Sequence, residues 1–77
     1  MRDRWASQAQ GFVRSLMRHD QGGVLAINAA VRALQAGGEP DGFHRRGYHR
    51  LHVGPYRVHC ITEDEILNVV RIDRVKE

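Results

Sequence analysis

Two alternating segments joined by only two residues constrain the fold more than any other feature of the sequence. Polar and apolar residues alternate over residues 48–53 and again over residues 56–61, as expected for two half-buried β-strands. Gly54 and Pro55 lie between them and suit a type II′ turn, because Gly54 can adopt the positive φ of the first central position. The sequence therefore predicts a tight β-hairpin.

The hairpin register separates the side chains into two faces. One face is apolar and is expected to pack against the rest of the chain; it holds Leu51, Val53, Tyr56, Val58 and Cys60. The other face, here called the polar face, holds Tyr48, Arg50, His52, Arg57 and His59. Like charges on neighbouring strands weaken a sheet, so this composition favours an anionic ligand.

Two further strands are predicted. Residues 66–74 form a third strand after an acidic turn at residues 63–65, and residues 2–5 add a short edge strand. The sheet is thus expected to have three or four strands.

The length of the acidic turn decides which side chains of the third strand face the core. A three-residue loop would set Arg71 beside Arg57 on the polar face and bring Val70 and Ile72 into the core. A two-residue loop would bury Arg71 against Val58, which is costly for a charged side chain. We therefore expect the longer loop.

The first half of the chain has the three-and-four apolar spacing of two amphipathic helices. The first is predicted over residues 6–19, and Gly22 with Gly23 is expected to break it. The second runs from Val24 until Gly37 and Gly38 end it. A helical hairpin of this kind needs a sheet to cover its apolar stripes, so the fold class is α+β.

The length of 77 residues allows one domain, over residues 1–77. A single cysteine, Cys60, excludes an internal disulfide framework and favours a reducing, cytoplasmic setting. No apolar run approaches the ~20 residues of a membrane span, and the N-terminus lacks a signal-peptide pattern.

Charge is distributed unevenly. Eleven of the 12 basic residues are arginine, which favours bidentate recognition of phosphate. No acidic residue occurs between Asp41 and Glu63, and this interval contains Arg45, Arg46, Arg50, Arg57, His44, His49, His52 and His59. The segment is a candidate for binding a polyanion, and a solvated basic surface is the alternative interpretation.

The polar face also has groups suited to metal-independent RNA cleavage. Histidine exchanges protons near neutral pH, and arginine stabilises the charge on an attacked phosphate. On these residues alone, binding without catalysis is favoured over cleavage, because neither His52 nor His59 has an obvious orienting carboxylate in the sequence. A metal site is not expected, since His49 and Cys60 face the core while the other two histidines face away. No cofactor is predicted.

The order of helix, helix, "PDG" and "YHRLHVGPYRVHCITEDEILNVVRIDRV" resembles the RelE/ParE superfamily of toxins from type II toxin–antitoxin modules. The resemblance implies a helical hairpin on a twisted antiparallel sheet and a cognate antitoxin as partner. RelE-type members cleave mRNA on the ribosome without metal, whereas ParE-type members poison DNA gyrase. A relative that only binds RNA or an antitoxin is the third alternative.

Arg57 matches the arginine of the family's Tyr-Arg motif, Arg50 a basic position of the preceding strand, and Arg74 a basic position late in the last strand. Tyr48 stands where RelE-type nucleases often have another basic residue. The family's C-terminal tyrosine has no counterpart in this sequence. From their chemistry, and not from the resemblance, His52 and His59 are the candidates to replace it. The predicted catalytic residues are Arg57, His59, His52 and Arg74, and the predicted RNA-binding residues are Arg45, Arg46, Tyr48, Arg50 and Arg71.

Overall fold

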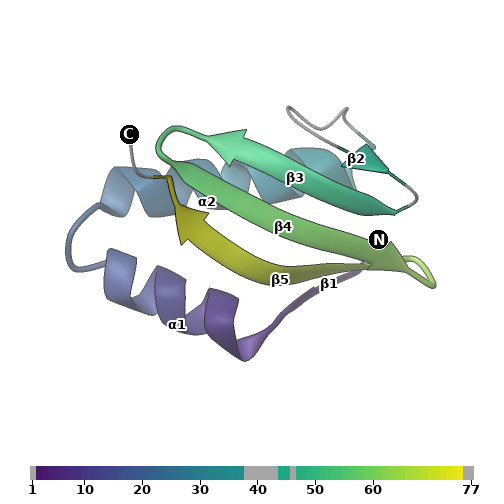
Figure 1. Ribbon diagram of the computed structural model, residues 1–77, viewed down its shortest axis with the longest axis horizontal. Coiled ribbons are helices and arrows are strands. Elements are labelled where there is room, and N and C mark those ends of the chain that lie inside the picture. The colour runs from purple at the N-terminus through teal and green to yellow at the C-terminus, as the bar shows by residue number, and fades with distance from the viewer. Residues whose placement is uncertain (1, 38–43, 46, 76–77) are drawn as a thin grey trace.

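A computed structural model describes residues 2–37, 44–45 and 47–75 of the chain. Its elements follow the order β1 (Arg2–Trp5), α1 (Ser7–Leu16), α2 (Gln21–Gln35), β2 (His44–Arg45), β3 (Tyr48–Val53), β4 (Tyr56–Glu63) and β5 (Ile66–Arg74). The two helices lie on one side of a twisted sheet (Figure 1). The α+β class predicted from the sequence is confirmed.

The sheet has five strands in the order β1-β5-β4-β3-β2, which is more than the three or four expected. The additional strand is β2, a two-residue strand within a stretch expected to form turns. Two residues are too few to show an alternating pattern. The sheet is also mixed, because β1 runs parallel to β5 while the other pairs are antiparallel.

The β3–β4 hairpin has the predicted register. Val53 pairs with Tyr56 across the turn, and Gly54 has the positive φ that the turn requires, at 57°. The predicted apolar face is buried against the helices: Leu51, Val53, Tyr56, Val58 and Cys60 all belong to the core, with Leu67, Val69 and Ile72 from β5 and Ala9, Ile27 and Val31 from the helices.

The expected three-residue loop between β4 and β5 is wrong. Glu63 pairs with Ile66, so the turn has only two central residues, Asp64 and Glu65. Both adopt positive φ, at 50° and 63°, and two such residues in succession characterise the type I′ turn that joins antiparallel strands tightly.

A β-bulge in β5 keeps Arg71 exposed despite the short turn. Cys60 pairs with Val69 but its neighbour His59 pairs with Arg71, so Val70 is an extra residue on β5. The bulge reverses the alternation of β5 beyond this point. Val70 is half-buried and is not part of the core, so the prediction that it faces the core is wrong.

The helices are joined differently from the prediction. α1 ends at Leu16, and Gly22 and Gly23 lie inside the first turn of α2. The side chain of Asp20 caps α2 by accepting a hydrogen bond from the Gly23 amide at 2.9 Å. A Cβ atom on Gly23 would lie 2.8 Å from the Tyr56 ring, so this glycine permits close packing and does not end a helix.

Two contacts fix the helical hairpin to the sheet. The Tyr56 hydroxyl donates a hydrogen bond of 2.7 Å to Asp20. The Gln8 amide makes two bonds to the backbone of Ile72: its Nε2 donates to the carbonyl at 3.0 Å, and its Oε1 accepts from the amide at 2.9 Å. Gln8 thereby provides hydrogen-bond partners for the backbone of β5 beyond the end of β1. Within the described ranges, no helix is long and apolar enough to cross a bilayer.

Candidate functional site

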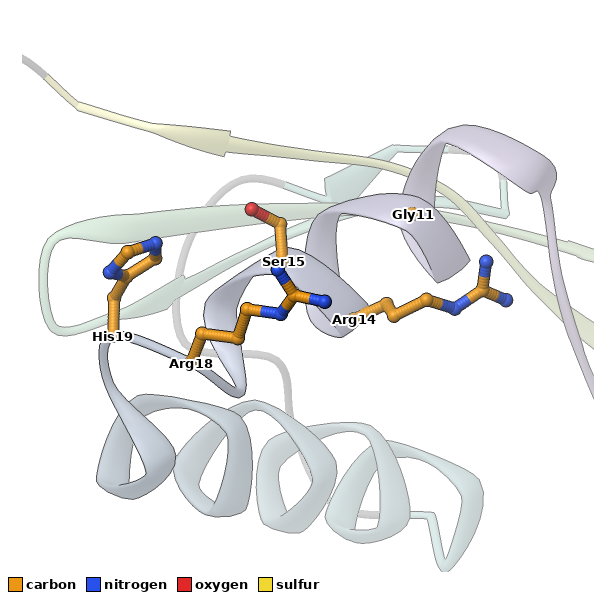
Figure 2. A pocket seen from close by; sticks show the side chains of 5 residues that line it. All are labelled: Gly11, Arg14, Ser15, Arg18 and His19. Atoms are coloured by element: carbon orange, nitrogen blue, oxygen red, sulfur yellow. The ribbon is translucent and has the colours of Figure 1, made fainter.

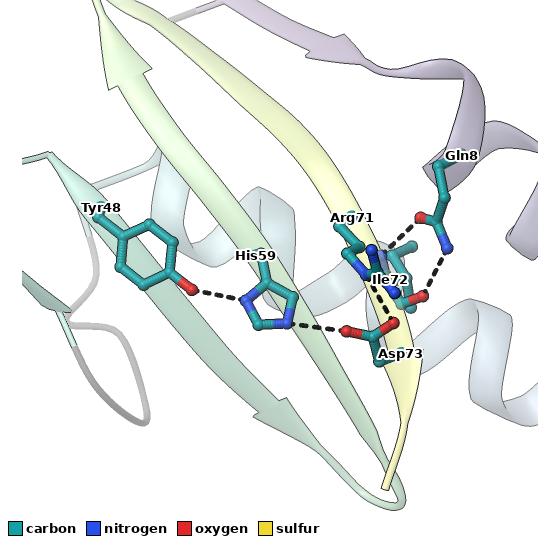
Figure 3. A network of polar contacts seen from close by, with 6 residues as sticks. All are labelled: Gln8, Tyr48, His59, Arg71, Ile72 and Asp73. Atoms are coloured by element: carbon teal, nitrogen blue, oxygen red, sulfur yellow. Dashed lines mark hydrogen bonds and ion pairs between the residues drawn. The ribbon is translucent and has the colours of Figure 1, made fainter.

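A chain of hydrogen bonds crosses three strands on the polar face (Figure 3). The Tyr48 hydroxyl lies 2.6 Å from Nδ1 of His59, and Nε2 of His59 lies 3.2 Å from Oδ2 of Asp73. Arg71 donates from Nε to Oδ1 of Asp73 at 2.9 Å. We refer to Tyr48, His59 and Asp73 as the Tyr–His–Asp chain.

The strand register explains how these side chains meet. Tyr48 pairs with Ile61 and is therefore a diagonal neighbour of His59 on the same face. Asp73 pairs with Arg57 and is diagonal to His59 from the other side. Diagonal neighbours lie within reach of long and aromatic side chains, so the imidazole can contact both partners at once.

The proton positions on His59 follow from the partners. The hydrogen bond from Arg71, and then the charge of its guanidinium, lower the pKa of Asp73, so this carboxyl group is ionised at neutral pH. An ionised carboxylate only accepts hydrogen bonds. Nε2 of His59 therefore carries the proton shared with Asp73, and in the neutral tautomer that this leaves, Nδ1 accepts from the Tyr48 hydroxyl.

Asp73 is the orienting carboxylate that sequence reasoning did not find, so the expectation that His59 lacks one is wrong. The expected three-residue loop would place Arg71, and not Asp73, beside Arg57. The bulge at Val70 changes which β5 residues face outward, and it brings Asp73 opposite Arg57. The only signal in the sequence is an acidic residue two positions after Arg71.

The structure places two more predicted cations beside the Tyr–His–Asp chain. Arg50 pairs with His59, and Arg57 pairs with both His52 and Asp73. Arg50 and Arg57 are half-buried, whereas His52 is exposed. A hollow of about 190 Å³ at the end of the β3–β4 hairpin is lined in part by His52 and Arg57. The polar face therefore combines a positive surface with an oriented imidazole.

Of the remaining predicted residues, Arg74 lies away from this cluster, and the side chains of Arg45 and Arg46 are not described. Arg74 pairs with Tyr56 on the helix side of the sheet, where its charge helps to lower the pKa of Asp20, although the hydrogen bond from Tyr56 is the main cause. Arg45 lies in β2 opposite Tyr48, and only its backbone position is described. Arg46 lies outside the described residues.

The histidine and cysteine side chains that the structure describes do not converge on a metal site. Within the ranges that the structure describes, no group of three or more histidine, cysteine, aspartate or glutamate residues is placed to hold a metal ion. Cys60 is fully buried opposite His49, and burial raises the pKa of its thiol to about 12. This thiol is protonated at neutral pH and is a packing residue of the core.

A helical hairpin on the apolar side of a small twisted sheet, with a basic opposite side, is a fold that this chain shares with solved chains of toxin–antitoxin complexes. The chain has the fold of a chain from the "Chromosomal ParDE TA system from P. aeruginosa", with a TM-score of 0.72 and 19% identity over 99% of this chain and 97% of that one.

Chains from two structures of the YoeB–YefM toxin–antitoxin complex of Staphylococcus aureus have the same fold. Their TM-scores are 0.76 and 0.74, with 13% and 14% identity, over 99% and 100% of this chain and 98% of each of those chains. No family model matches the sequence, and a comparison with curated proteins returns no match.

Proposed function

We propose that this protein is the toxin of a type II toxin–antitoxin pair and inhibits growth by metal-independent cleavage of ribosome-associated mRNA. The observation that carries the proposal is the Tyr–His–Asp chain beside Arg50 and Arg57 on one exposed side of the sheet. The shared fold with chains of two toxin–antitoxin complexes supports the same class of function. Such an activity places the protein in the cytoplasm.

The proposed reaction is attack of the RNA 2′-hydroxyl on the adjacent phosphate, which forms a cyclic phosphate and releases the 5′-oxygen. The Tyr48 oxygen takes the proton of the 2′-hydroxyl while its own proton passes to Nδ1 of His59, at 2.6 Å. The carboxylate of Asp73 stabilises the imidazolium that forms. His52, exposed on the same face, is the proposed donor of a proton to the leaving 5′-oxygen.

The arginines of the polar face are the proposed phosphate ligands. Arg57 lies between His52 and Asp73 in the register, and Arg50 lies opposite His59, so both are close to the proposed proton-transfer groups. Arg71 contacts Asp73 through Nε and is 64% exposed, which leaves most of its guanidinium at the surface. Guanidinium groups stabilise the charge that builds on phosphate oxygens during the attack.

An Arg57→Ala variant tests the proposal. Induced expression of the wild-type protein is expected to arrest growth and to shorten mRNAs, measured by primer extension on ribosome-bound transcripts. Arg57→Ala is expected to abolish both effects and to keep a cooperative thermal melt. Arg32→Ala, which removes an exposed arginine from α2, serves as the control for charge and is expected to arrest growth normally. Unchanged growth arrest by folded Arg57→Ala contradicts the proposed role.

Inhibition of DNA gyrase is a second candidate function, favoured by the fold shared with a chain of the ParDE system. Pulse labelling separates the two candidates. Cleavage of mRNA stops protein synthesis first, whereas inhibition of gyrase stops DNA synthesis first and induces a DNA-damage response.

A cognate antitoxin is the proposed partner. We expect the product of a neighbouring gene to contain an acidic or amphipathic segment that covers Arg50 and Arg57 and becomes ordered on binding. Because the antitoxin binds only the folded toxin, the melting temperature should rise with antitoxin concentration. A titration that follows both melting and growth arrest tests this expectation.

A further inference from the structure

A second basic surface lies on the exposed side of α1 and on the turn that follows it, on the helix side of the sheet and therefore away from the polar face. A hollow of about 300 Å³ is lined by Gly11, Arg14, Ser15, Arg18 and His19 (Figure 2). All five residues are exposed. We call this set the α1 surface. None of its residues contributes to the hydrophobic core or to the Tyr–His–Asp chain.

The charges of the α1 surface are not balanced within the part of the chain that the structure describes. Arg14 lies in the last turn of α1 and Arg18 in the turn that follows the helix, and both line the same hollow. The described ion pairs involve only His59, Arg71 and Asp73. The nearest acidic residue along the chain is Asp20, whose carboxylate accepts hydrogen bonds from the Gly23 amide and the Tyr56 hydroxyl. The hollow therefore has two guanidinium groups on its lining and no described acidic partner for them, and an anionic ligand would offset their charge.

Gly11 is the second observation that points to a ligand. Glycine in the middle of a helix lowers the stability of the helix relative to alanine, and close packing against a neighbour is one structural reason to have it there. A Cβ atom on Gly11 would meet nothing within 4 Å. No described part of the protein thus requires glycine here. The space above Gly11 is open to another molecule.

We propose that the α1 surface binds the sugar–phosphate backbone of RNA. Arg14 and Arg18 line the hollow from the last turn of α1 and from the turn after it, so each guanidinium can hold its own phosphate of one strand. The Ser15 hydroxyl lies between them and can donate to a phosphate or sugar oxygen. The absence of a side chain at Gly11 lets the backbone of the strand lie close to the helix.

An acidic peptide fits the α1 surface less well than RNA does. A peptide that becomes ordered on a helix gains most of its affinity from apolar side chains placed in a groove. The hollow is lined by arginine, serine, histidine and glycine, and interfaces with nucleic acids are polar and positively charged in this way. The choice of RNA over DNA rests on the proposed function, whereas the contact with a phosphate backbone does not.

Binding of a fluorescein-labelled 16-base-pair RNA hairpin, followed by anisotropy over a series of salt concentrations, tests the proposal. The measurements use Arg57→Ala protein, so that the polar face neither cleaves the probe nor dominates binding. Adding Arg14→Ala or Arg18→Ala is expected to weaken binding about tenfold each and to lower the salt slope by about one each. Arg32→Ala removes one exposed charge from α2 and is expected to change neither quantity.

A Gly11→Gln variant separates binding from stability. Glutamine is a better helix former than glycine, so the melting temperature should rise. Its side chain fills the hollow, so binding of the RNA hairpin should weaken. Unchanged affinity in Gly11→Gln, or in folded Arg14→Ala and Arg18→Ala proteins, overturns the proposal. A twelve-residue polyglutamate peptide that binds as tightly as the hairpin, with the same arginine dependence, overturns it in favour of an acidic protein partner.

The two proposals fail separately. Growth arrest that survives Arg57→Ala contradicts mRNA cleavage at the polar face but leaves the hairpin measurements on α1 intact. If Arg57→Ala loses growth arrest but binding of the RNA hairpin does not depend on Arg14 or Arg18, only the proposal for the α1 surface is contradicted.

Discussion

Nε2 of His59 lies 3.2 Å from Oδ2 of Asp73, on the neighbouring strand and 14 residues further along the chain. The same carboxylate binds Arg71 through its other oxygen. Asp73 is therefore shared between a group proposed to transfer protons and a group proposed to bind phosphate. A change at this one residue should affect the orientation of the imidazole and the position of the guanidinium together.

Asp73→Asn is expected to reduce RNA cleavage by at least about tenfold, because an amide does not stabilise an imidazolium as a carboxylate does. Stability should change little, since Asp73 is 38% exposed. Cleavage of a model RNA and thermal melting measure the two effects. Asp64→Asn makes the same chemical change in the β4–β5 turn and should leave cleavage unchanged. Full activity of Asp73→Asn would show that His59 needs no carboxylate.

His59→Gln and His52→Gln are expected to retain RNA binding and to lose cleavage by about a hundredfold or more, the typical range for a general acid or base. Wild-type activity should persist in EDTA. Gel-shift and cleavage measurements on the same RNA separate binding from chemistry. Normal cleavage by the double variant would show that both histidines are bystanders, and inactivation by EDTA with recovery in zinc would overturn the metal-free mechanism.

Tyr56→Phe is expected to lower the melting temperature by roughly 5 °C at neutral pH, because it removes the hydrogen bond to a charged carboxylate. That bond lowers the pKa of Asp20 from its ordinary value of 3.8. A carboxyl group with a lowered pKa stabilises the fold above its ordinary pKa and loses this effect as pH falls through the folded-state value. The difference between wild type and Tyr56→Phe should therefore shrink below about pH 4, and melts from pH 2 to 7 measure it. A constant difference would contradict the role of Asp20.

Gln8→Ala is expected to destabilise the protein by about 1–3 kcal/mol, because it leaves the amide and carbonyl of Ile72 without their side-chain partner. Chemical denaturation measures the change. Gln10→Ala is the control on the same helix: its amide bonds the exposed carbonyl of Trp5, which water can satisfy after the substitution. Equal destabilisation by the two variants would mean that Gln8 has no special role at the sheet edge.

The helical hairpin and the β3–β4 pairing could be predicted because each depends on local patterns. The three-and-four spacing defines the helices, and the dipeptide at Gly54 fixes the register of the hairpin. The polar face followed directly from that register. The long-range placement of Asp20 under Tyr56 could not be predicted, since nothing local shows that a helix cap also binds a residue of the sheet.

The bulge in β5 is the reason why the position of Asp73 could not be predicted from the sequence. Val69 and Val70 are both apolar, so the sequence does not show which of them is the extra residue. The hydrophobic pattern alone favoured a longer turn as the way to expose Arg71. The structure reaches the same exposure of Arg71 with a short turn and a bulge, and only this combination places Asp73 against His59.

Strand β5 lies between β1 and β4, so β1 pairs with residues synthesised much later: Arg2 lies opposite Ile66. A growing chain that has not reached Ile66 has no partner for β1 and lacks both Arg71 and Asp73. Folding during synthesis can therefore form the helices and the β3–β4 hairpin, but it cannot complete the sheet. The proposed nuclease surface is assembled only once β5 has left the ribosome. The order of strands thus delays completion of the sheet, and with it the proposed activity, until β5 has been synthesised.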